Sequence, residues 1–425
     1  MIGGRWGRFA AALLAALGLA AGLAVVLQAE RTDVRRQQYR EMALRTQAWT
    51  WQHLAYLDGA ADCASAPYVT YRRDTQNVTI SDHWYVALQL RADAALVRLG
   101  EERFRCQVDK AVGWMEQLWD PGQAGFAPRA ELDGSNPTLQ DVYADDNGIV
   151  GLAFVEAARV TSDPRVRARA IDAAERAAGY LLNSGLWDDT FGGGLWWNNQ
   201  REATGEGKPA QTTALMAHLM AELYAETGRP LYRERGLAAV DWLDRALWND
   251  HHGLYAYSVN RPPGGPGGAV VAQHYFGYDQ AIVIQTLLRL YRSEPGREAY
   301  LARAERVGRA VDRAFWHPEL GGYTLEAGVT DLYAPYGAWV SEALLDLYSA
   351  DGDTFWRERA RANLDALDRT FLDPVHGGYS RLAFRCSAER IVLCRPGERW
   401  GMDRIIYTMT QALMQRAAAL QAAAY

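Results

Sequence analysis

Apolar residues recur along most of this chain at the three-to-four-residue spacing of helices, and the helical patterns come in pairs joined by short turns. One pair spans Ala214–Glu226 and Pro230–Leu247, and another spans Asp279–Arg292 and Glu298–Phe315. About twelve helices are predicted in all. The others are Val34–Leu57, a pair within His83–Leu118, a pair within Ile149–Leu182, Trp339–Ser349 with Phe355–Phe371, and Ile405–Ala424.

The two members of each pair differ in polarity. Ile149–Val160 carries charge only at Glu156 and Arg159, whereas Arg165–Arg176 is charged at half of its positions. A helix that is apolar on most sides is buried, and a charged amphipathic helix faces water. The pattern therefore predicts an all-α fold, an (α/α)6 toroid of six inner and six outer helices. An open solenoid has the same periodicity but does not stop so readily at six pairs.

A short phrase follows each of five helical pairs. It has an apolar residue and usually a tryptophan, then a polar residue, and after a few residues glycine followed by an aromatic or apolar residue. Such repetition is typical of repeat architectures. The phrase begins at Leu118, Leu186, Leu247, Phe315 and Phe371.

The long connections all lie between pairs and return to the starts of the inner helices. Long structured loops in a compact domain are usually functional, so we expect these helix starts to surround one polar, aromatic mouth. The segments at the mouth are Asp82-His83-Trp84, Asp145-Asp146, residues 208–213, Tyr278-Asp279-Gln280, residues 333–339 and Met402-Asp403-Arg404.

Asp145 and Asp146 are the candidate catalytic residues. They fall in the first turn of a predicted helix, where the helix dipole and unpaired N–H groups favour anions. Successive helical residues point about 100° apart, so one carboxyl group can face an anomeric carbon while the other faces the leaving oxygen. If their environments differ, one is ionised and the other protonated, as glycosidic acid–base chemistry requires. Helix capping is the alternative role.

Further residues of the mouth are candidate substrate contacts. Lys208 can hold a sugar hydroxyl or a carboxylate, and Asp279 and Gln280 can hydrogen-bond sugar hydroxyls. Aromatic rings stack on sugars, although they also pack loops. The alternatives are a surface lysine, an N-cap and ordinary packing. The candidate stacking residues are Trp84, Trp196, Trp197, Tyr336 and Trp339.

Composition excludes several classes of protein. The net charge is −6 and no basic face is evident, which argues against a nucleic-acid partner. Phosphate loops, nucleotide-binding fingerprints and zinc-type spacings are absent from the sequence, so we expect neither a cofactor nor a metal. The scattered histidines are expected to be structural. We expect an oligosaccharide or polysaccharide substrate and a monomer.

The N-terminus predicts a targeting segment in residues 1–29, with one glycosidase-like domain in residues 30–425. Arg5 and Arg8 precede the uncharged stretch Phe9–Leu27, which is long enough to cross a bilayer core as a helix. We favour an uncleaved membrane anchor over a cleaved signal peptide, because Leu27-Gln28-Ala29 is a poor cleavage site. In either case the domain is expected outside the cytoplasmic membrane.

Four cysteines suit an exported domain, and three pairings are possible. The most economical pairing is Cys63–Cys106 with Cys386–Cys394, because the latter two bracket a short loop. Free, partly buried thiols are the alternative.

On these residues the chain resembles glycoside hydrolase family 76, the endo-α-1,6-mannanases. The resemblance covers most of residues 45–420. It implies a metal-independent, retaining enzyme in which Asp145 is the nucleophile and Asp146 the acid/base. The segments that carry it are Tyr143-Ala144-Asp145-Asp146-Asn147-Gly148, Gly192-Gly193-Gly194-Leu195-Trp196-Trp197-Asn198, Lys208 and Tyr278-Asp279-Gln280.

The chain departs from the family pattern near the expected sugar-binding wall. Asn147-Gly148-Ile149-Val150 stands where the family has a tryptophan, Pro209 replaces an asparagine, and Asp279-Gln280-Ala281 replaces Asn-Gln-Gly. These changes concern the particular glycan more than the reaction. Competing hypotheses are a transglycosylase, an unsaturated glucuronyl hydrolase, a sugar 2-epimerase, and a non-catalytic glycan-binding envelope protein on the same fold.

Overall fold

The computed structural model is predominantly helical. Twelve helices lie within the described residues, which are 30–55, 71–73, 76–77, 80–138, 140–261, 268–294, 296–375, 377–386, 394, 400–403 and 406–425. The predicted targeting segment 1–29, Cys63 and Arg404 lie outside them. Within them, every helix is too short or too polar to cross a membrane.

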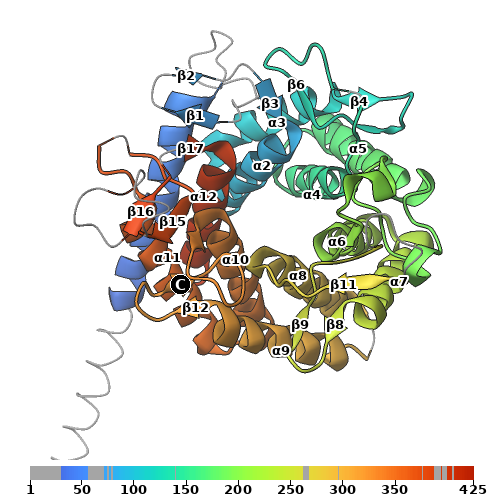
Figure 1. Ribbon diagram of the computed structural model, residues 1–425. Coiled ribbons are helices and arrows are strands. Elements are labelled where there is room, and N and C mark those ends of the chain that lie inside the picture. The colour runs from blue at the N-terminus through green and yellow to red at the C-terminus, as the bar shows by residue number, and fades with distance from the viewer. Residues whose placement is uncertain are drawn as a thin grey trace, which may run out of the picture.

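Six inner helices form a closed ring (Figure 1). Each packs against the next, and the sixth packs against the first, so the ring has no free edge. The toroid is thus built as predicted. The inner helices are α2 (His83–Arg98), α4 (Ala144–Val160), α6 (Ala210–Thr227), α8 (Gly277–Ser293), α10 (Ala334–Asp351) and α12 (Thr408–Ala423).

Six outer helices surround this ring. Five follow their inner partner after a short turn, and the helix of residues 30–54 covers the remaining side, next to the C-terminal helices in Figure 1. The hydroxyl group of Tyr39 donates to Asp365 at 2.6 Å across that contact. The other outer helices are α3 (Arg105–Glu116), α5 (Pro164–Asn183), α7 (Pro230–Ala246), α9 (Glu298–Phe315) and α11 (Thr354–Phe371).

Local sequence sets the helix ends. Asp163 accepts from the Arg165 N–H at 2.8 Å with Pro164 in the first turn, a strong start signal for α5. Gly228 and Gly352 end α6 and α10 with φ of 68° and 74°, a left-handed conformation that favours glycine.

Each recurrent phrase forms a small antiparallel hairpin or bridge at the end of an outer helix. In three inner helices, an amide side chain at the fourth position holds such a hairpin by hydrogen bonds. Gln280 accepts from the Tyr255 N–H at 2.9 Å and donates to the Tyr255 carbonyl oxygen at 2.8 Å. Gln411 makes the same two bonds to Tyr379. Asn147 accepts from the Phe126 N–H at 2.9 Å. The paired strands are β4 (Trp119–Asp120) with β5 (Gly125–Phe126), β8 (Trp248–Asn249) with β9 (Leu254–Tyr255), and β12 (Trp316–His317) with β13 (Gly322–Tyr323).

The remaining strands join the long loops around the inner-helix starts. Three sheets have the orders β17-β1-β2, β11-β10-β7 and β14-β15-β16, and β3 pairs with β6. Their bounds are β1 Tyr71–Arg73, β2 Gln76–Asn77, β3 Ile80–Asp82, β6 Arg129–Glu131, β7 Lys208–Pro209, β10 Ser258–Asn260, β11 Val270–Ala272, β14 Leu332–Tyr333, β15 Leu382–Arg385, β16 Trp400–Met402 and β17 Ile406–Tyr407.

The predicted Cys386–Cys394 disulfide is present, with a Cα–Cα distance of 6.1 Å. It closes the connection between β15 and β16. Cys106 is also disulfide-bonded.

Charged side chains lie buried where the inner helices face one another. Arg416 of α12 donates to Glu156 of α4 at 2.7 Å and to Glu342 of α10 at 2.9 Å, and Arg91 of α2 donates to Glu156 at 2.8 Å. This central ion network links four inner helices. Because buried charges require close partners, it fixes the relative positions of these helices.

Candidate active site

The starts of the six inner helices lie at one end of the ring, as predicted, and the Asp145–Asp146 pair lies among them. The helices run parallel because each pair returns the chain to the same end. Short strands or extended residues precede every one of these starts, so loop residues and first-turn residues form the mouth together.

Asp145 is the better hydrogen-bonded member of the pair. Its side chain is 8% exposed, and its Oδ2 accepts from the Trp197 indole N–H at 2.9 Å. Its Oδ1 accepts from the Asp146 backbone N–H at 3.1 Å. Burial raises the pKa of Asp145 to about 6, against the opposing effect of these donors and of Gln211. Asp145 is therefore largely ionised at neutral pH.

Asp146 has a different environment. Burial raises its pKa well above the ordinary value, and the negative charges of Asp145 and Asp82 raise it further, while Arg129 opposes them. Arg129 also donates to Asp82 Oδ2 at 3.2 Å. Asp146 therefore favours the protonated form, so the two adjacent carboxyl groups differ as an acid/base and nucleophile pair must.

Helix capping accounts for one contact of Asp145 and for none of Asp146. The N-cap of α4 is Tyr143, whose side chain makes no capping bond. The Ala144 N–H donates to the Trp197 carbonyl at 2.8 Å, and the Asn147 N–H donates to the Tyr143 carbonyl at 3.2 Å. Backbone carbonyl groups thus satisfy two N–H groups of the first turn, the Asp145 carboxyl group satisfies that of Asp146, and the Asp146 carboxyl group caps no N–H group.

A continuous group of aromatic rings lies at the starts of α2, α8 and α10. Tyr278 and Tyr336 have ring centroids 4.0 Å apart, and Trp339 lies 6.1 Å from Trp84 and 6.5 Å from Tyr278. Trp84, Tyr278 and Tyr336 are partly exposed, whereas Trp339 is 2% exposed and donates to Gln285 at 3.0 Å. Trp339 therefore supports the aromatic wall from behind and offers no open face.

Asp279 is buried beside this wall. Neither carboxyl oxygen has a hydrogen-bond partner among the described residues. Burial raises its pKa well above the ordinary value and outweighs the neighbouring Tyr278 hydroxyl, which favours ionisation. In its ionised form Asp279 would raise the pKa of Tyr257 and Tyr336. Burial favours the protonated form of Asp279.

Three predicted substrate contacts have internal partners instead. All donors of the Lys208 ammonium group are used within the protein, and its side chain is fully buried. Trp196 is 1% exposed and donates to Asp188 at 2.8 Å. Gln280 is the hairpin amide described above. These side chains have no free polar atom or face for a sugar. Of the predicted contacts, Trp84, Trp197 and Tyr336 are the partly exposed ones.

Three residues that were not among the predicted contacts interact electrostatically with the aspartate pair. They are Asp82, Arg129 and Tyr257. Asp82 directly precedes an inner helix, a signal that was available in the sequence. Arg129 comes from β6 and Tyr257 from the residue before β10. No periodic pattern marks these loop positions, so only the folded loops bring them to the pair.

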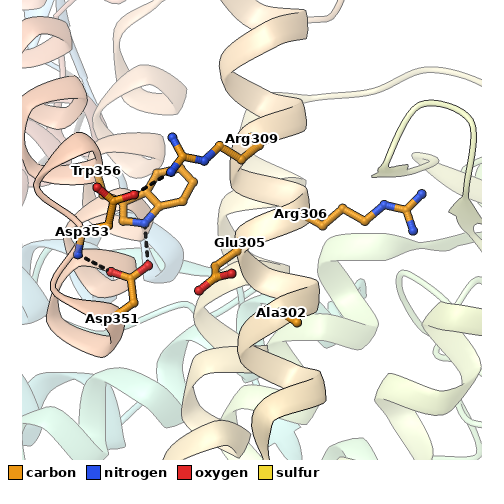
Figure 2. A pocket seen from close by; sticks show the side chains of 7 residues that line it. All are labelled: Ala302, Glu305, Arg306, Arg309, Asp351, Asp353 and Trp356. Atoms are coloured by element: carbon orange, nitrogen blue, oxygen red, sulfur yellow. Dashed lines mark hydrogen bonds and ion pairs between the residues drawn. The ribbon is translucent and has the colours of Figure 1, made fainter.

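Other potential sites are less suited to chemistry. No cluster of three or more His, Cys, Asp or Glu in the described part of the chain is arranged for a metal. A hollow of about 490 Å³ lies between α9 and α11 (Figure 2). Four of its groups are paired with one another: Arg309 donates to Asp353 at 2.5 Å and Trp356 to Asp351 at 2.7 Å.

The sequence matches one protein family. Residues 131–335 match the sequence profile described as Glycosyl hydrolase family 76. No curated protein matches the sequence at a significant level.

Solved structures share the fold at low identity. A family 76 α-mannanase of Bacteroides thetaiotaomicron has a TM-score of 0.69 at 17% identity, over 92% of this chain and 98% of its own. An α-1,6-mannanase of Salegentibacter sp. HEL1_6 has a TM-score of 0.67 at 16% identity, over 91% of this chain and 100% of its own. That structure is a complex with α-1,6-mannotriose, of a variant inactive after two consecutive aspartates were replaced by asparagine. A sugar epimerase from a ruminal bacterium also has a TM-score of 0.67, at 11% identity over 88% of this chain and 98% of its own.

The fold alone thus does not separate hydrolase from epimerase, and the sequence match over residues 131–335 is to the hydrolase family. The predicted resemblance to glycoside hydrolase family 76 is confirmed by this match, and the chain shares the fold of family 76 structures over most of its length.

Proposed function

We propose that the protein is an exported, retaining glycoside hydrolase that cleaves α-1,6-mannan or a related α-linked cell-surface glycan without a metal. The observation that carries the proposal is the unequal environment of Asp145 and Asp146 at the start of α4. The α-1,6-mannanase complex described above, inactive after replacement of a consecutive aspartate pair, supports both the chemistry and the substrate class.

The proposed reaction has two displacements. The Asp145 carboxylate attacks the anomeric carbon, the glycosidic C–O bond breaks, and Asp146 gives its proton to the departing oxygen. Asp146, now a carboxylate, then takes a proton from water, whose oxygen attacks the anomeric carbon and releases Asp145. Trp197 holds Asp145 in place through its indole N–H.

The charges of the mouth favour a neutral glycan. Three acidic groups interact at the mouth, namely Asp82, Asp145 and Asp146. Arg129 is the cation that acts on Asp146, and it also donates to Asp82. Because Arg129 is paired with Asp82, a uronide carboxylate beside the ionised Asp145 would be repelled, which disfavours the glucuronyl hydrolase hypothesis. Tyr278, Tyr336 and Trp84 offer faces for stacking on uncharged sugar rings.

An epimerase mechanism has little support at the same place. His83 is the histidine expected at the mouth, but it is buried, and burial lowers its pKa to about 3. Its Nδ1 lies 3.1 Å from the Ala127 carbonyl oxygen. His83 is therefore a neutral packing residue between Trp114 and Phe126 and is unsuited to proton transfer.

We propose that the enzyme acts outside the cytoplasmic membrane as a monomer. The proposal rests on the apolar stretch Phe9–Leu27 after Arg5 and Arg8 in the sequence. The Cys386–Cys394 disulfide is consistent with an oxidising compartment.

The test is digestion of linear α-1,6-mannan, branched mannan and unsaturated uronides, with product analysis. We expect cleavage of an α-mannan with retention, and a loss of about 10⁴-fold or more in kcat/KM for Asp145→Asn. Asp146→Asn should keep the first step on a mannoside with an activated leaving group, because such a group departs without a proton. Asp172→Asn, an exposed outer-helix change, is the control.

The pH profile gives a second check. Because the nucleophile must be ionised, kcat/KM should fall as the pH drops below about 6, the pKa of Asp145. A 2-fluoromannosyl fluoride should label Asp145. Glycan binding without turnover of any α-mannan would instead identify a binding protein.

A further inference from the structure

Lys208 is a buried cation held by a single loop. From β7, its Nζ donates to Asp188 Oδ1 at 2.7 Å and to the carbonyl oxygens of Asp188, Thr190 and Gly193 at 3.1, 2.8 and 2.7 Å. A lysine side chain that is 0% exposed is stable only with such partners. Lys208 therefore fixes the backbone of residues 188–193, and this arrangement has no role in the reaction derived above.

The same loop is fixed to the segment that follows it. Asp188 Oδ2 accepts from the Trp196 indole N–H at 2.8 Å, and the Lys208 Nζ lies 5.1 Å from the centre of the Trp196 ring. Gly194 has φ of 78°, and a Cβ there would lie 2.4 Å from the Trp242 ring. The chain from the loop to Trp196 thus has little freedom to move.

The next residue, Trp197, contacts the start of α4 twice. Its carbonyl oxygen accepts from the Ala144 N–H at 2.8 Å, and its indole N–H donates to Asp145 Oδ2 at 2.9 Å. Its own N–H donates to the carbonyl oxygen of Gly207, the residue before Lys208, at 3.2 Å. Lys208 is therefore linked to Asp145 through the chain on both sides of Trp197.

We propose that Lys208 is a positioning residue for Asp145: by fixing the 188–193 loop and the Trp196-Trp197 segment, it holds the Trp197 indole N–H on the Asp145 carboxylate. The inference rests on the proposed function for the role of Asp145 as nucleophile. Its consequence is that a buried cation controls the orientation and ionisation of Asp145 without touching the substrate.

Different neighbouring groups act on Lys208 and on Asp145. A change at Lys208 therefore affects Asp145 through the positions of the residues between them and not through a direct charge interaction. The charged groups that act on Lys208 are Asp188, Asp189 and Arg201. The titratable groups around Asp145 and Asp146 come from several elements. They are Asp82 before α2, Arg129 of β6, Tyr143 before α4, Tyr180 of α5, Tyr257 before β10 and Tyr278 of α8.

The test is the indole N–H resonance of Trp197 in the ¹⁵N-labelled protein, assigned by its loss in Trp197→Phe. Lys208→Met should move this resonance toward its position in Asp145→Asn, where the carboxylate is absent. We also expect kcat/KM to fall about 10²-fold, mainly through kcat, since a small displacement of a reacting group has that effect. The acid limb should move to higher pH because the Trp197 N–H favours ionised Asp145.

The control is Lys110→Met, the same chemical change on outer helix α3, which should alter neither readout. If Lys208→Met does not fold, Asp188→Asn keeps the three carbonyl acceptors of Lys208 and should give a smaller change in the same direction. A lower melting temperature with an unchanged Trp197 resonance and acid limb would overturn the proposal. If the wild type cleaves no α-mannan, the proposed function fails, while the resonance still decides whether Lys208 positions Trp197.

Discussion

Asp279 lies in the first turn of α8 with no exposed surface and no hydrogen-bond partner among the described residues. Its pKa is raised by burial, so the folded state keeps its proton to a higher pH than the unfolded state does. Between the unfolded pKa of about 4 and the folded pKa, the folded state binds more protons, and stability falls as the pH rises.

We therefore predict that Asp279→Asn is more stable than the wild type at neutral pH. The difference in free energy of unfolding should be smallest near pH 4 and grow as the pH rises, because asparagine cannot ionise. Denaturant unfolding at several pH values measures it, with the exposed Asp33→Asn as control. A difference that does not change with pH would contradict the raised pKa.

At the residue scale, sequence identifies polar groups at the mouth but not their partners. Asp145 and Asp146 are recognisable because two carboxyl groups begin a helix. Lys208 and Trp196 are equally recognisable, yet they bond to Asp188, a residue far enough away that only the folded loop reveals the contact. A buried ion pair and a substrate-binding lysine have the same sequence signal.

At the element scale, the hairpin amides are the repeated device of the fold. Gln280 satisfies both backbone groups of Tyr255 from the start of α8, and Gln411 does so for Tyr379 from α12. Removing the amide leaves a buried N–H and a buried carbonyl group without partners.

We expect Gln280→Ala to lower the free energy of unfolding by about 2–6 kcal/mol, the sum of two such losses. Urea unfolding measures it. Gln123→Ala, in the exposed turn between β4 and β5, should have little effect. An equally small change at Gln280 would show that water replaces the amide at this hairpin.

Helix positions follow from the sequence, and α7 and α9 begin at Pro230 and Glu298 as predicted, but the apolar pattern alone marks some inner-helix starts too late. The apolar pattern predicts beginnings at Ile149 and Trp339, whereas α4 and α10 begin at Ala144 and Ala334. The first turn of each carries residues that face the mouth, such as Asp146 and Tyr336, so the apolar pattern starts one turn late. The strands of two or three residues are too short for any periodic signal.

At the scale of the whole molecule, ring closure depends on charges as well as apolar packing. Arg416 connects α12 to Glu156 of α4 and Glu342 of α10. Replacing it leaves two buried carboxylates with fewer cations, which is strongly unfavourable.

Arg416→Met should therefore lower the free energy of unfolding by about 3–5 kcal/mol. Guanidinium unfolding checks this, with Arg313→Met on the exposed side of α9 as the matched change. Little or no loss would mean that the apolar contacts alone close the ring. The closed ring itself was predictable from the number of pairs, whereas the central ion network was not, because its members lie far apart in sequence.

The outer helix of residues 30–54 also places residue 30 on the face of the ring opposite the mouth. Tyr425 at the end of the chain lies 6.3 Å from Tyr39, ring to ring, and Arg35 lies 5.8 Å from the Tyr425 ring. The N-terminal helix thus begins beside the carboxyl end of α12, at the end of the ring away from the mouth. Under the proposal of a membrane anchor, attachment at residue 30 would leave the mouth on the side of the domain away from the membrane.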